Sequence, residues 1–151
     1  MSIDLNYLKS NRILKLDFLI SENSKMFVKI LLDSQNEFDR QKFGEALLDE
    51  LSDAAQVDII KLKISSARQW HKKYKNKVVS KQYGYYRPAS NYIYIYNYTA
   101  VQGKPLAPKT FLDTLLHEWL HHYDFKKLEL NSIHSSGFYK RLGHLKEMLG
   151  I

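Results

Sequence analysis

The chain has 151 residues, 44% apolar and 26% charged, with a formal net charge of +7, which is typical of one soluble globular domain spanning residues 1–151. It contains no cysteine, which excludes disulfides and thiolate metal sites. The first residues lack the basic start and apolar run of a signal peptide, and no stretch is long enough to cross a bilayer. We therefore expect a cytoplasmic protein that makes no membrane contact.

The N-terminal segment, residues 1–33, gives no clear assignment. Residues Arg12–Ile20 alternate roughly and are compatible with a strand or a short helix, and Met26–Leu32 is a second apolar run. Periodicity alone cannot assign runs this short to helix or strand.

The next segment has clearer signals. Ser34–Glu37 has the pattern of a capping box, and an apolar stripe behind it predicts a helix over 36–55. Val57–Ile64 is β-branched and predicts a strand. We expect a loop over Ser65–Lys77 and a short strand at Val78–Val79.

Positive charge is concentrated in the middle of the chain. Residues 59–112 contain eleven Lys or Arg and no acidic residue, whereas the rest of the chain has twelve basic and sixteen acidic residues. A one-sided basic block attracts phosphate backbones, so DNA is one partner to consider through residues 59–112. A solvated lysine face explains the same pattern equally well.

A hairpin is predicted within the basic block. The segment Tyr83–Asn91 leads through Pro88, Ser90 and Asn91 into Tyr92–Tyr98, which alternates strictly. The isoleucines suit a core, and the tyrosines on the other face suit either a groove wall or an outer sheet surface. Under the first reading, Tyr92, Tyr94 and Tyr96 are candidates for binding substrate.

A helix is predicted over 108–124, with Pro108 in its first turn. Two stripes run along this helix. The apolar one is Leu112, Leu116, Trp119, Leu120 and Tyr123, and the polar one is Asp113, His117, His121 and Asp124.

The polar stripe contains the motif His-Glu-x-x-His. Histidines four residues apart share a helix face, so His117 and His121 can bind one metal ion. Glu118 lies about 100° further round the helix, where it can take a proton from a metal-activated water. The motif predicts zinc as the cofactor and Glu118 as the general base of a metallopeptidase.

A catalytic zinc site needs a third protein ligand. His122 points away from His121, and His144 falls inside a last helix predicted over 136–149 behind Ser135 or Ser136. His134 lies in the loop before that helix, where the chain can turn back over the site. We therefore predict His134 as the third ligand.

Further residues have weaker support. Asp113 and Asp124 are candidates for accepting the second ring N–H of the ligand histidines. Tyr139 or a hairpin tyrosine could stabilise an oxyanion, and nothing in the sequence selects one. Glu147 could mimic the downstream glutamate ligand of thermolysin-like enzymes, but it falls in the last helix amid its apolar stripe.

The order of these motifs resembles the SprT-like metallopeptidase domain, a zincin-type family that includes the Spartan DNA–protein crosslink proteases. The matching pieces are Tyr83–Tyr85, Ile93–Ile95, Thr114–His121 and His134–Phe138. The resemblance implies an α+β fold with a small mixed or antiparallel sheet packed on helices. It also implies a zinc endopeptidase that hydrolyses protein or peptide substrates, with His117, His121 and His134 as ligands and Glu118 as base.

In zincin folds an edge strand lies along the cleft, and Tyr92–Tyr98 is the candidate for it. An alternative function is a basic nucleic-acid-binding module whose zinc site is mainly structural. Trp70, Tyr74, Tyr83, Tyr85 and Tyr86 would then offer stacking surfaces between the basic residues.

Overall fold

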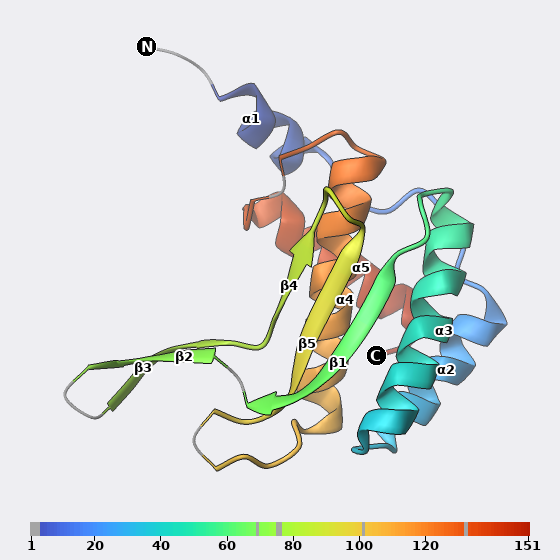
Figure 1. Cartoon of the computed structure of the whole chain (residues 1–151). Coiled ribbons are helices and arrows are strands. Elements are labelled where there is room, and N and C mark those ends of the chain that lie inside the picture. Colours follow the sequence, from blue (N-terminus) through green and yellow to red (C-terminus); the bar gives the residue numbers. More distant parts are fainter. Residues whose placement is uncertain (1–3, 69, 75–76, 101, 132) are drawn as a thin grey trace.

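The computed structural model of the chain describes residues 4–68, 70–74, 77–100, 102–131 and 133–151. Over 68–82 the description is of the backbone alone. Helices pack beside and behind a small sheet, and a separate two-stranded hairpin projects from this body (Figure 1).

The described residues form ten elements. The helices are α1 (Leu5–Arg12), α2 (Glu22–Leu32), α3 (Glu37–Ala55), α4 (Pro108–Lys126) and α5 (Ser136–Leu149). The strands are β1 (Lys61–Arg68), β2 (Trp70–Tyr74), β3 (Lys77–Gln82), β4 (Gly84–Arg87) and β5 (Tyr92–Tyr98). The prediction of a mixed α+β fold is confirmed. None of the described helices is long and apolar enough to span a membrane.

The main sheet has the strand order β1-β5-β4, in which β1 runs parallel to β5 and β4 runs antiparallel to it. Strands β2 and β3 pair with each other in the projecting hairpin. The expectation that Tyr92–Tyr98 is an edge strand is wrong, because β5 is hydrogen-bonded on both sides. The sheet edge nearest α4 is β4.

The alternation of β5 sets its two faces. Ile93, Ile95 and Asn97 are fully buried against the helices, whereas the intervening tyrosines are half-buried on the opposite face. There Tyr85 stacks on Tyr94 with ring centroids 5.1 Å apart. The tyrosine side chains therefore lie on the face of β5 opposite its buried isoleucines.

Helix α4 lies at the centre of the helical layer, in contact with β4, β5, α2, α3 and α5. It begins at Pro108, as predicted, and its apolar stripe is buried in the core. Helix α5 is capped by Ser135, whose hydroxyl accepts from the Phe138 N–H. The predicted capping box at Ser34 is wrong, because Asn36 is the N-cap of α3 and its side chain accepts from the Asp39 N–H.

Other boundaries also differ from expectation. The strand predicted at Val57–Ile64 begins at Lys61 and continues to Arg68. The loop predicted over Ser65–Lys77 is wrong, since this range includes the end of β1 and all of β2. The short strand at Val78–Val79 lies inside β3, as predicted. Residues 13–20 are irregular chain between α1 and α2.

Candidate metal centre

Helix α4 presents His117 and His121 on one face because residues four apart lie one turn above each other. Their Nε2 atoms are 3.1 Å apart. Both side chains are half-buried.

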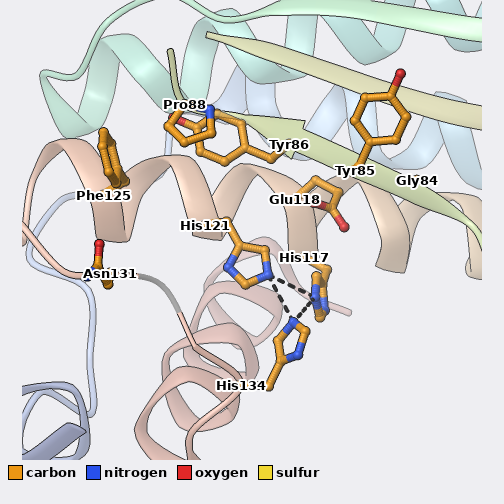
Figure 2. A pocket seen from close by; sticks show the side chains of 10 residues that line it. All are labelled: Gly84, Tyr85, Tyr86, Pro88, His117, Glu118, His121, Phe125, Asn131 and His134. Atoms are coloured by element: carbon orange, nitrogen blue, oxygen red, sulfur yellow. Dashed lines mark hydrogen bonds between the residues drawn. The ribbon is translucent and has the colours of Figure 1, made fainter. Parts of the chain in front are cut away.

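The third histidine comes from the irregular segment between α4 and α5. The Nε2 atom of His134 lies 2.9 Å from that of His117 and 3.0 Å from that of His121. Figure 2 shows the three rings directing these nitrogens at one point. The predicted set is therefore brought together, and it is the one group of three potential ligands found among the described residues.

The triangle of nitrogens fits a small tetrahedral cation. Zinc–nitrogen bonds of about 2.0–2.1 Å place ligand nitrogens about 3.3 Å apart. The observed separations of 2.9–3.1 Å are slightly shorter. Three imidazole nitrogens this close cannot all be satisfied by one another, because a neutral ring offers one donor and one acceptor. A cation at the centre would accept all three lone pairs.

The electrostatic setting keeps two of these rings neutral. Burial, together with His134 and Lys146, lowers the pKa of His117 to about 4. Burial, together with His117 and His134, lowers the pKa of His121 to about 3. A neutral imidazole is the form that binds a metal ion, so little proton displacement is needed at neutral pH.

Glu118 follows the first ligand on α4 and is buried, with 9% of its surface exposed. Burial raises the pKa of its carboxyl group to about 7. A group of this proton affinity is suited to accept and return a proton near neutral pH.

Two cavities meet at His117 and Glu118. One of about 450 Å³ is lined by Gly84, Tyr85, Tyr86, Pro88, His117, Glu118, His121, Phe125, Asn131 and His134 (Figure 2). The other, of about 390 Å³, is lined by Tyr83, Gly84, Thr110, Asp113, Thr114, His117 and Glu118. Both contain Gly84, His117 and Glu118, so open space extends to either side of the site along the start of β4.

Gly84 lies at this junction without a side chain. A Cβ atom there would come within 2.6 Å of the Tyr94 carbonyl oxygen and 3.2 Å of an Ile95 side-chain carbon. Glycine is therefore required for the close approach of β4 to β5. The sequence contained Tyr-Gly-Tyr as a weak motif but gave no reason for the glycine.

Phe138 supports the ligand rings from α5. Its fully buried ring stacks on His121 with centroids 4.5 Å apart and meets the ring of His117 edge-on at 5.0 Å. The sequence placed Phe138 in an apolar stripe of the last helix and, four residues after His134, at the end of one of the matching motifs. Neither placement predicted its contact with the rings of His117 and His121.

His122 does not join the metal ligands, as predicted. It is fully buried, and its Nε2–H donates to the Asp58 carbonyl at 2.7 Å. Its Nδ1 therefore accepts from the Tyr86 hydroxyl at 2.8 Å. These bonds attach α4 to β4 and to the chain before β1.

The two predicted supporting carboxylates have cationic partners. Asp113 pairs with Lys146 at 2.9 Å. Asp124 is buried and accepts from Arg141 through both oxygens, at 3.0 and 2.7 Å. A role for either in orienting a ligand histidine stays a prediction.

The remaining candidates are tyrosines and the basic segment. Tyr92, Tyr94 and Tyr96 are on the sheet face turned away from α4 and line neither cavity. Tyr139 is half-exposed, and its ring centroid is 6.0 Å from that of His134. The side chains of the basic segment 68–82, including Trp70 and Tyr74, lie outside the described residues.

Comparison of the chain with protein-family models, curated proteins and solved structures found no match. The site is therefore interpreted from its own geometry.

Proposed function

We propose that the protein is a zinc-dependent endopeptidase of the SprT-like, zincin type. The observation that carries this proposal is the triangle of Nε2 atoms from His117, His121 and His134, with Glu118 beside it on α4. Three histidines leave a fourth position of a tetrahedral ion for water or substrate, which is the arrangement of catalytic rather than structural zinc.

Each residue then has a defined task. The three histidines would hold the metal through their Nε2 atoms. When bound, zinc supplies Lewis acidity that makes water a nucleophile near neutral pH and polarises a carbonyl. The Glu118 carboxylate accepts a proton from that water and delivers it to the leaving amine.

The surroundings of the site support an extended peptide as the substrate. The two cavities lie on either side of His117 and Glu118, so a chain can continue in both directions from the cleaved bond. This favours cleavage within a chain over removal of a terminal residue. Strand β4 has only β5 as a neighbour in the described sheet, so its other edge can add a substrate strand by main-chain hydrogen bonds.

The test separates metal binding from proton transfer. The variant Glu118→Gln should retain zinc, because the three ligands are unchanged, but should lose cleavage of an unfolded protein such as casein. General-base catalysis contributes about 10²–10⁴ in rate, so the loss should be at least about a hundredfold. Zinc content by elemental analysis and peptide release are measured on the same sample.

Glu147→Gln is the matched control, because it makes the same chemical change at an exposed position of α5. Glu147 lines a separate cavity formed with α2 residues, so its variant should retain both zinc and cleavage. Full cleavage by Glu118→Gln would contradict the assigned mechanism, and a wild-type protein without zinc would contradict the metal site.

A second candidate function is binding of single-stranded nucleic acid through the β2–β3 hairpin. Residues 68–82 contain six Lys or Arg and no acidic residue. Within this range, strands β2 and β3 form the hairpin that projects from the body (Figure 1). A protruding basic ribbon is well placed to contact a phosphate backbone. This function could recruit the peptidase to DNA-bound protein substrates.

This candidate is tested by charge reversal. Lys72→Glu with Lys73→Glu should weaken binding of single-stranded DNA and lower the slope of affinity against salt by about 1.4, for two phosphate contacts. The control is Lys15→Glu with Lys29→Glu, which changes the net charge by the same amount. Lys15 is exposed before α2, and Lys29 is exposed within it. Equal loss in both variants would assign the binding to overall charge and not to the hairpin.

A further inference from the structure

Helix α1 lies against the segment that supplies the third histidine. Its residues Lys9 and Ser10 lie three and four positions after Asn6 and therefore share a helix face with it, and Ile13 follows as the C-cap. Each contributes a hydrogen bond toward α5 or the segment between α4 and α5, residues 127–135. Two chain regions more than a hundred residues apart are thereby joined next to the metal ligands.

Asn6 holds the segment before His134. Its side-chain amide donates to the Asn131 carbonyl at 2.7 Å and accepts from the Asn131 N–H at 2.8 Å. A two-point bond of this kind fixes the direction of the peptide as well as its position. Asn131 is three residues from the ligand and also lines the larger cavity.

Two further α1 side chains hold the chain directly after His134. The hydroxyls of Ser10 and Ser135 are 2.7 Å apart, and Ser135 is the N-cap of α5. Asn11 accepts from the Gly137 N–H at 2.8 Å and from the Ser136 hydroxyl at 3.1 Å. The ligand segment is therefore attached to α1 at both ends.

A buried arginine connects the same region to α4. The guanidinium of Arg141 donates to both oxygens of Asp124, to the Ser10 hydroxyl, and to the carbonyls of Ser10 and Ile13. These five bonds use all of its donors. The end of α1 is thus fixed to the helix that carries His117 and His121.

We propose that α1 is a positioning element for the metal centre, which holds Asn131 and Ser135 on either side of His134 so that His134 completes the triangle with His117 and His121. The inference rests on the proposed metal site. His134 is exposed and lies on irregular chain, and its ring contacts on α5 are with Phe138 and Tyr139. The backbone on either side of it needs separate support to stay in one place. The bonds from α1 supply that support, and a ligand held in place loses less conformational freedom when the metal binds.

The test removes the two amide clamps without touching a ligand. Asn6→Ala with Asn11→Ala deletes four hydrogen bonds to the ligand segment and the start of α5, while alanine preserves helix propensity. Zinc affinity is measured by competition with a chromophoric chelator. We expect about tenfold weaker binding, the lower end of the range for groups that orient metal ligands.

Tyr7→Ala is the matched control, because Tyr7 lies between the two asparagines on α1 and is half-exposed. It should bind zinc as the unaltered chain does. Circular dichroism checks that the unaltered protein, the double variant and the Tyr7→Ala variant have equal helix content without metal. An unchanged zinc affinity in the double variant would overturn the inference while leaving the metal site intact.

A reciprocal measurement needs no variant. If α1 positions His134, zinc must stabilise the docking of α1 by the same coupling. Hydrogen exchange of the amides in α1 should slow when zinc is added, with no comparable change in α2. If zinc does not change hydrogen exchange in α1, the inference about α1 is overturned. If the unaltered chain binds no zinc, both this inference and the proposed function are overturned.

Discussion

Three histidines close together on α4 have different partners, and those partners give them different roles. His117 and His121 direct Nε2 toward a third histidine, whereas His122 has both ring nitrogens engaged by a hydroxyl and a carbonyl. Burial lowers the pKa of all three. All three histidines therefore favour the neutral form, and only geometry distinguishes the two candidate metal ligands from His122.

This difference can be tested at Tyr86. Replacing Tyr86 with Phe removes the hydroxyl that donates to Nδ1 of His122, which leaves a buried acceptor without its donor. We expect the free energy of unfolding of the metal-free protein to fall by about 1–3 kcal/mol. Urea denaturation measures it.

Tyr85→Phe is the control for this substitution. It makes the same chemical change on the neighbouring residue and keeps the ring that stacks on Tyr94. Its stability should stay close to that of the unaltered protein. Equal stability of both variants would show that the Tyr86 hydroxyl contributes nothing to holding His122.

At individual positions, the sequence predicted those residues whose role depends on local spacing. His117, Glu118 and His121 follow from helix geometry, and His134 follows from the need for a third ligand among few histidines. The stacking of Phe138 on His121 was not predictable, because it depends on how α5 packs against α4. For the tyrosines of β5 the sequence left a groove wall and an outer sheet surface open, because alternation defines two faces without saying what covers each.

Among the elements, helices were predicted better than strands. Periodic apolar stripes and end signals located α3, α4 and α5 to within a few residues. The extent of β1 and the position of β4 at the edge depend on pairing between distant segments, which no local pattern contains. Helix α1 was missed because its stabilising contacts are polar bonds to residues 128–141 and not an apolar stripe.

The packing of α1 against α5 depends on Gly137. A Cβ atom at this position would lie 2.0 Å from the Ser10 carbonyl oxygen and 2.8 Å from the Asn11 Cα, both of which are backbone atoms. Gly137→Ala should therefore force the two helices apart and lower the free energy of unfolding, despite the better helix propensity of alanine.

Gly143→Ala in the same helix is the matched control, because nothing lies within 4 Å of a Cβ atom there. It should raise stability by up to about 1 kcal/mol. Chemical denaturation of the two variants measures the contrast, and a stabilised Gly137→Ala protein would contradict the close contact between α1 and α5.

For the whole molecule, the proposed metal centre would link parts of the chain that are far apart in sequence. Two candidate ligands belong to α4 in the middle of the helical layer, and the third belongs to a segment held by α1 and α5. Metal binding should therefore favour the complete folded arrangement over states in which α1 or α5 has separated.

This coupling predicts a large effect of zinc on thermal stability. At a free zinc concentration about a thousand times the dissociation constant, binding to the native state alone adds about 4 kcal/mol. For a chain of this size, that corresponds to an increase in Tm of about 10 °C, measured by differential scanning calorimetry with zinc or with a chelator.

His134→Ala should nearly abolish the increase and leave the Tm of the metal-free protein almost unchanged, because the His134 side chain is exposed. Lys140→Ala, at another exposed position in the same region, should retain the full increase. A full zinc-dependent increase in the His134→Ala protein would mean that the metal is held elsewhere.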